Sequence, residues 1–153
     1  MSARDLSEEC LCFGWIDSKP GRIDDRRTAL LCTPRKAGSS WSLVNKERFA
    51  ALQSEGRIAQ SGQQTALAAQ ADGSWDRLAD VDALVVPEDL LAAFDSNPQA
   101  RLHWDGFPPS ARRGILEWIL NAKRPSTRSQ RIAETVDKAS RNERALQWKP
   151  RTD

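Results

Sequence analysis

Oppositely charged side chains crowd one stretch near the N-terminus of this 153-residue sequence. They are Asp17, Asp24, Asp25, Arg26 and Arg27, followed after a short apolar run by Arg35 and Lys36. Paired carboxylates can hold a cation, and guanidinium groups can hold an anion. We therefore predict a polar binding site here, with its charges gathered near one end of a hairpin. The alternative is a network of internal ion pairs that holds a long loop.

Small hydroxyl residues precede a helical pattern just after this stretch. Ser40 or Ser42 can cap the helix by accepting a hydrogen bond from its first turn. The alternative is an anion bound by the exposed N–H groups of the helix start, with Arg35 close enough to assist. Trp41 and Asn45 fall in the same segment and are counted with the candidate site.

A second candidate site is a basic corner near the C-terminus. It consists of Lys123, Arg124, Thr127, Arg128 and Arg131. Residues 121–153 hold nine basic and four acidic side chains, whereas the whole chain has a formal net charge of only +2. Such a corner can bind phosphate or an acidic peptide, and the alternative is a solvated basic face. No nucleic-acid motif or interleaved aromatic pattern accompanies it.

The sequence contains no recognisable catalytic or metal-binding set. Zinc sites commonly use four ligands in paired spacing, and Cys10, Cys12, Cys32 and His103 lack that spacing. We interpret the three cysteines as reduced core residues. We expect no cofactor, no metal and no enzymatic activity.

Hydrophobic patterning and turn signals predict the elements that position these residues. Residues 13–16 and 27–33 are predicted to be strands of an antiparallel hairpin, with the first strand buried and a turn at Pro20-Gly21. A short helix is predicted over residues 5–12. About six helices follow the hairpin, with starts at Ser40 or Ser42, at Ser61, where Gln64 completes a capping box, at Pro87, at Asn97, at Ser110, and at Ser126 or Thr127. In the helix that starts at Ser110, an apolar stripe that faces a core is predicted at Ile115, Trp118, Ile119 and Ala122. This is an α+β fold in a single domain, residues 1–146, with a flexible tail over 147–153.

Three segments together resemble a known family. They are the CLCFGWID run at residues 10–17 with its continuation to Asn45, the EGRI run at 55–58, and residues 86–132 from VPEDL to the AKRPSTRSQRI run. In order and spacing they resemble the YdeI/OmpD-associated family of bacterial proteins, also labelled bacteriocin-protection proteins, over about residues 8–145. The resemblance implies a small α+β protein linked to tolerance of bacteriocins or cationic antimicrobial peptides, with no established reaction.

Family members usually carry additional residues before the segment that corresponds to CLCFGWID, including a strand and a helix. A chain without them would expose a strand edge near Phe13, which a second copy could cover as a homodimer. The sequence shows no export signal and no apolar run of membrane-spanning length, so we expect a cytoplasmic protein without membrane insertion. We therefore predict a non-enzymatic interaction protein with a protein partner. The alternative is a nucleic-acid or phospho-ligand binder that uses the basic corner.

Overall fold

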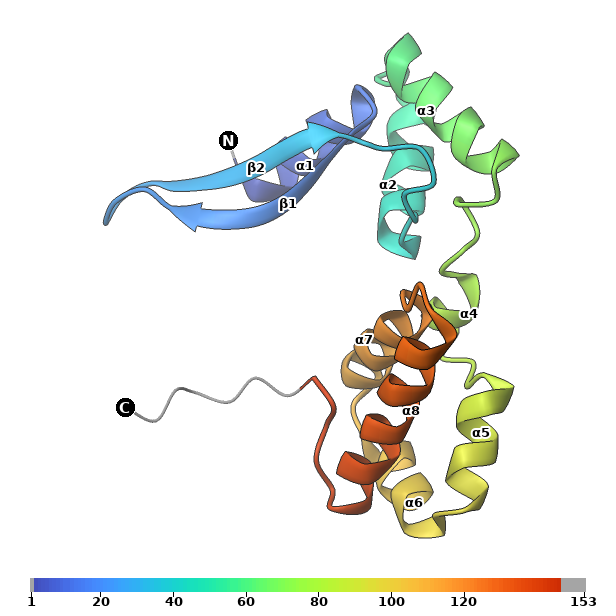
Figure 1. Cartoon of the computed structure of the whole chain (residues 1–153). Coiled ribbons are helices and arrows are strands. Elements are labelled where there is room, and N and C mark those ends of the chain that lie inside the picture. The colour runs from blue at the N-terminus through green and yellow to red at the C-terminus, as the bar shows by residue number, and fades with distance from the viewer. Residues whose placement is uncertain (1, 147–153) are drawn as a thin grey trace. The chain divides into compact units, whose positions relative to one another are not determined.

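Helices and one hairpin make up the first half of the chain, and helices alone make up the second half (Figure 1). The structure is a computed structural model that describes residues 2–146. Its elements are α1 (Ala3–Cys12), β1 (Trp15–Arg22), β2 (Thr28–Pro34), α2 (Leu43–Ser54), α3 (Gln60–Ala71), α4 (Ala79–Asp82), α5 (Glu88–Asp95), α6 (Pro98–Gly106), α7 (Pro109–Leu120) and α8 (Pro125–Ser140). The predicted α+β class is confirmed. The predicted flexible tail over residues 147–153 lies outside the described residues.

The chain divides into two compact units at Ala79. The first holds the hairpin with α1, α2 and α3, and the second holds α5 to α8. The predicted single domain over residues 1–146 stays a prediction, and each unit is described by itself below.

The hairpin of the first unit is longer and more exposed than predicted. Its strands pair antiparallel from Trp15 opposite Pro34 to Arg22 opposite Thr28, with an irregularity between Asp17 and Pro20. Pro20 and Gly21 therefore lie inside β1, and the predicted turn there is wrong. In a two-stranded sheet both strands are edges, so a proline without an N–H group can be accommodated beside an irregularity. The chain instead reverses over residues 23–27.

The prediction of a buried first strand is also wrong. Phe13 is 53% exposed and Trp15 is 41% exposed. Phe13 ends helix α1 rather than beginning the strand. Helix α1 packs against β1, and a sheet of only two strands has too little surface to bury both faces.

The core of the first unit lies among α1, α2 and α3. Leu11, Phe49, Leu52 and Ala66 are buried in it. Trp41 is 1% exposed and meets Phe49 edge-on at 5.6 Å between ring centroids, a geometry that aromatic pairs favour. This aromatic centre fixes the loop that joins β2 to α2.

The second unit is a helical bundle with its own apolar centre. Leu90, Phe94, Trp104, Ile115 and Ile119 are each at most 1% exposed. The predicted stripe on the helix around residue 115 is confirmed at Ile115 and Ile119, while Trp118 is only partly buried. None of the described helices is long and apolar enough to span a bilayer.

Several predicted helix starts are wrong, and proline explains two of them. The predicted starts at Ser110 and Ser126 fall inside helices that already begin at Pro109 and Pro125. Proline suits the first helical position because its fixed φ is helical and no N–H partner is needed there. Helix α3 begins at Gln60 without the predicted Ser61 capping box. The predicted caps at Ser42 and Asn97 are confirmed.

Candidate functional site

The charged tip of the hairpin is a network of local ion pairs. The Asp24 carboxylate accepts hydrogen bonds from the backbone N–H groups of Arg26 and Arg27 at 2.9 and 2.8 Å. It also pairs with the Arg27 guanidinium, and Asp25 pairs with Arg22. The hydrogen bond from Arg27 is the main reason that the pKa of Asp24 lies below its usual range. The tip therefore matches the alternative interpretation, in which neighbouring charges satisfy one another.

The predicted gathering of all these charges at one end of the hairpin is wrong. Asp24, Asp25 and Arg26 lie at the tip, whereas Arg35 follows β2 at the opposite end. Seven residues of extended strand separate the ends by about 20 Å. Asp17 lies on β1 opposite Cys32, and its Oδ2 accepts a hydrogen bond from Ser7 at 2.9 Å.

Arg35 is the most unusual charged residue of the first unit. It is only 8% exposed, and its backbone N–H donates to the carbonyl of Gly14 at 3.0 Å. Its guanidinium carbon lies 4.1 Å from the centroid of the Trp41 ring, and Nη1 donates to the Ser40 carbonyl at 2.9 Å. The other two nitrogens, Nε and Nη2, are buried without a hydrogen-bond partner among the described residues. A buried cation with two unused donors is costly for a protein to maintain.

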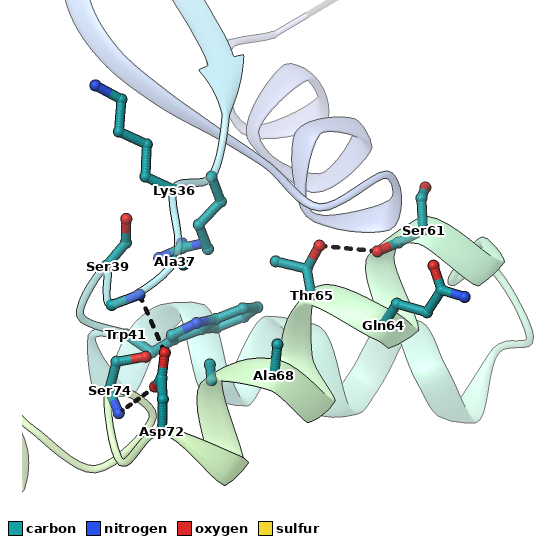
Figure 2. Close-up of a pocket in the computed structure, with 13 residues that line it drawn as sticks. Lys36, Ala37, Ser39, Trp41, Ser61, Gln64, Thr65, Ala68, Asp72 and Ser74 are labelled. Atoms are coloured by element: carbon teal, nitrogen blue, oxygen red, sulfur yellow. Dashed lines mark hydrogen bonds between the residues drawn. The ribbon is translucent and has the colours of Figure 1, made fainter.

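Arg35 lines a pocket of about 400 Å³ in the first unit. One side is the loop of residues 36–41, and the other is helix α3 with Thr65 and Ala68 (Figure 2). The indole of Trp41 lies between them (Figure 2). Asp72 joins the two sides, because its carboxylate accepts hydrogen bonds from the backbone N–H groups of Ser74 at 2.9 Å and Gly38 at 3.1 Å. Hydrogen bonding from Ser74, with that from Gly38, keeps the pKa of Asp72 below its usual value.

The start of helix α2 is closed by its own cap. The Ser42 hydroxyl accepts a hydrogen bond from the backbone N–H of Asn45 at 3.3 Å. The capping interpretation of this segment is therefore confirmed. Arg35 and Trp41 line the pocket, whereas Asn45 serves through its backbone in the cap.

The basic corner of the second unit is largely neutralised or packed. Arg128 binds both carboxylate oxygens of Asp89, at 2.6 and 2.9 Å. Arg131 donates to the carbonyl of Trp118 and lies 5.0 Å from its ring centroid. Thr127 lies in the first turn of α8 and is half-buried.

Lys123 and Arg124 are exposed, and they are the remaining cations of the predicted corner. A groove for a phosphate backbone needs several cations that face solvent together. The nucleic-acid alternative therefore gains no support from this arrangement.

The Asp89–Arg128 pair predicts a pH-dependent contribution to stability. The hydrogen bond from Arg128 lowers the pKa of Asp89 in the folded state. The stabilisation is therefore present above the usual carboxylate pKa of about 4, and it is lost as the pH falls through the lowered folded-state value. Because both side chains are partly exposed, we expect Asp89→Asn to reduce the free energy of unfolding by about 0.5–1 kcal/mol at pH 7.

Urea denaturation at pH 7 and near pH 2.5 checks this expectation. The difference between Asp89→Asn and the unmodified protein should shrink at the lower pH, because protonation of the carboxylate removes the ion pair with Arg128. Asp95→Asn is the matched control, since Asp95 is exposed on the same helix and forms no ion pair among the described residues. A difference that is equal at both pH values would contradict the role given to the pair.

Two of the three cysteines, Cys10 and Cys12, are buried free thiols. Burial is the main cause that raises the pKa of Cys10 to about 12, and burial also raises the pKa of Cys12. A raised thiol pKa leaves little thiolate at neutral pH, and the thiolate is the nucleophile. No group of three or more His, Cys, Asp or Glu side chains within residues 2–146 is arranged to hold a metal ion.

Sequence reasoning placed Arg35 in the site but missed the opposite wall of its pocket. Thr65, Ala68 and Asp72 belong to α3 and its end, which follow Arg35 by thirty residues or more. No local pattern marks Thr65 and Ala68, because their approach to Arg35 depends on how α3 packs. For Asp72, a local signal was available in the Asp72-Gly73-Ser74 sequence. It is typical of a turn in which an aspartate carboxylate accepts a hydrogen bond from the backbone N–H group two residues later.

Comparison with known families assigns one match to each unit. Residues 83–142 match the OmdA family model, described as "Bacteriocin-protection, YdeI or OmpD-Associated". The predicted resemblance is confirmed over residues 83–142, the part of the predicted range that the OmdA model covers. The OmdA match lies in the second unit, whereas residues 1–65 match a domain of unknown function, DUF8412. No curated protein and no solved structure matches the chain.

Proposed function

We propose that this protein is a non-enzymatic interaction protein that contributes to tolerance of bacteriocins and cationic antimicrobial peptides. The observation that carries the proposal is the OmdA match over residues 83–142, whose description names bacteriocin protection. The neutralised basic corner supports a protein or peptide partner over a nucleic acid, because Arg128 is already paired with Asp89.

An acidic segment at the start of the second unit supports a cationic partner. Residues 80–105 hold six acidic side chains and one basic side chain. On α5, Glu88, Leu91 and Asp95 are exposed at helical spacing i, i+3 and i+7, so they lie on one face. Glu88 and Asp95 form no ion pair among the described residues. A face with two carboxylates around a leucine complements a peptide that is both cationic and amphipathic.

A charge-reversal experiment tests this proposal. The double variant Glu88→Lys/Asp95→Lys should bind a synthetic cationic amphipathic peptide at least about tenfold more weakly at low salt, measured by fluorescence anisotropy. The matched control is Asp25→Lys/Glu47→Lys, which changes the net charge equally on exposed residues of the first unit. If both variants bind the peptide equally weakly, net charge alone determines the affinity. If the unmodified protein does not bind the peptide, direct recognition is contradicted.

A cellular experiment tests the tolerance itself. A bacterial strain from which the gene is deleted should die at lower peptide concentrations than its parent. The unmodified gene should restore survival, and the Glu88→Lys/Asp95→Lys variant should restore it less well than the Asp25→Lys/Glu47→Lys control. Equal survival of the parent and the deletion strain would contradict the proposed function.

A further inference from the structure

The unpaired nitrogens of Arg35 lie along one edge of its guanidinium group. In arginine, Nε–H and one Nη–H₂ group form a side-on fork that matches the two oxygens of a carboxylate. Nη1 is occupied by the Ser40 carbonyl, and the two nitrogens without a partner are Nε and Nη2. The donors that remain are therefore the pair required for side-on binding.

The protein also holds this fork in one orientation. The Trp41 ring at 4.1 Å and the Nη1 hydrogen bond together restrict the guanidinium group. Burial lowers the pKa of Arg35 to about 10, a value at which the group still carries its charge at neutral pH. Asp17 acts on this charge from beyond ion-pair distance, and its carboxylate already accepts from Ser7. The cation is thus fixed, charged and without a direct counterion among the described residues.

We propose that the Arg35 pocket binds a small organic carboxylate, held by Nε–H and Nη2–H of Arg35. Nothing in the family matches assigns a ligand to this pocket. The volume of about 400 Å³ falls in the range of small-molecule sites. Ala68 is exposed and provides apolar surface for a short hydrocarbon body attached to the carboxylate, and the buried Trp41 and Ala69 also line the pocket.

The remaining donors of the pocket favour a carboxylate over phosphate. The backbone N–H of Gly38 is used by Asp72, that of Ser39 by the Lys36 carbonyl, and that of Trp41 by the Ser74 carbonyl. A phosphate site commonly gathers several backbone N–H groups around a tetrahedral anion, and these three N–H groups are already occupied. The Asp72 carboxylate at the pocket also disfavours a dianion more than a monoanion.

Access to the fork requires a local opening of the pocket. Both unpaired nitrogens are shielded from solvent in this structure. The pocket is also lined by Lys36, Ala37 and Gly38, which follow Arg35 in the chain and are all exposed. Figure 2 shows the Lys36 side chain extending away from Trp41.

A titration observed at Arg35 itself tests the proposal. The probe is butyrate, and butyramide is its uncharged control of the same shape. The Arg35 Nε–H resonance in ¹H–¹⁵N spectra of the full chain should shift with butyrate and saturate, and it should not shift with butyramide. No shift at butyrate concentrations up to about 50 mM would overturn the proposal. Saturable binding of inorganic phosphate in place of butyrate would overturn the carboxylate assignment.

Variants connect the binding to the fork. Arg35→Gln should weaken butyrate binding at least tenfold, because hydrogen bonds to a charged group are lost, and Arg35→Lys should recover little of it. Arg26→Gln is the matched control at an exposed arginine and should bind normally. Ala68→Leu reduces the space in the pocket from an exposed helix position without changing Arg35, and it should also weaken binding. Normal butyrate binding by a folded Ala68→Leu or Arg35→Gln protein would overturn the proposal.

Discussion

Replacing Gly62 with alanine is expected to destabilise the first unit by about 3 kcal/mol, at the upper end of the usual range for overpacking. Gly62 is buried on α3, where a Cβ atom would lie 2.3 Å from the carbonyl oxygen of Cys12 and 2.9 Å from its carbonyl carbon. Those atoms belong to the backbone at the end of α1, so no side-chain rotation relieves the clash. The hydrogen bond from the Ala59 N–H to the same carbonyl, at 2.9 Å, holds the two helices at this distance.

The urea midpoint of unfolding, followed by circular dichroism, measures this effect. Gly114→Ala is the matched control, because Gly114 also lies within a helix but has open space where a Cβ would stand. Alanine should stabilise that position by about 0.5–1 kcal/mol through its helix propensity. The two substitutions should therefore shift the midpoint in opposite directions. A Gly62→Ala midpoint equal to that of the unmodified protein would mean that α3 does not pack on α1 as described.

The hairpin shows why an element can be predicted while its limits cannot. Apolar and β-branched residues on both sides of a charged stretch were enough to predict two antiparallel strands. Pro20-Gly21 is typical of a turn, but it is equally compatible with an edge strand that contains an irregularity. Only the pairing partner decides between the two, and Pro20 lies opposite Leu30. Local sequence contains no information about that partner.

Helix starts were predictable where one local rule dominated. Asn97-Pro98 combines a capping side chain with proline in the first turn, and the structure has this cap, with Asn97 accepting from Ala100 at 3.0 Å. At Ser61 the capping rule failed because of a tertiary contact. The Ser61 hydroxyl donates a hydrogen bond to the carbonyl of Phe13 at 3.1 Å and does not cap the helix. A capping box predicted from spacing alone fails when a tertiary partner takes the hydroxyl.

In the candidate site too, contacts between sequence neighbours could be predicted, whereas contacts that depend on tertiary packing could not. The local ion pairs at Asp24 could be inferred from neighbouring opposite charges. The burial of Arg35 could not, because it depends on Trp41 and on helix α3, which packs against α1. Charge clustering therefore identified a residue of the pocket but grouped it with the wrong neighbours. A lone arginine after a strand carries no sequence signal that distinguishes a solvated side chain from a buried, unpaired one.

Trp104→Ala is expected to reduce the free energy of unfolding of the second unit by about 3–5 kcal/mol. Trp104 is fully buried, and its ring lies 5.5 Å from that of Phe94 and 6.3 Å from that of Phe107, between centroids. Alanine would leave a large cavity between α5 and α6 and would remove both aromatic contacts. The cost is high because the surrounding helices can collapse only partly into the space.

Leu102→Ala is the matched control on the same helix, since Leu102 is 72% exposed. It should change the urea midpoint little, so the comparison of Trp104→Ala with Leu102→Ala separates the effect of burial from any effect on helix propensity.

The loss of stability in Trp104→Ala also bears on the proposed function. Trp104 contacts Phe94, and Phe94 and Leu90 anchor α5, whose exposed face carries Glu88 and Asp95. Trp104→Ala should therefore weaken cationic-peptide binding without changing any exposed charge. If Trp104→Ala lowers the free energy of unfolding as expected but the variant still binds the peptide normally, peptide recognition does not need an ordered α5 face.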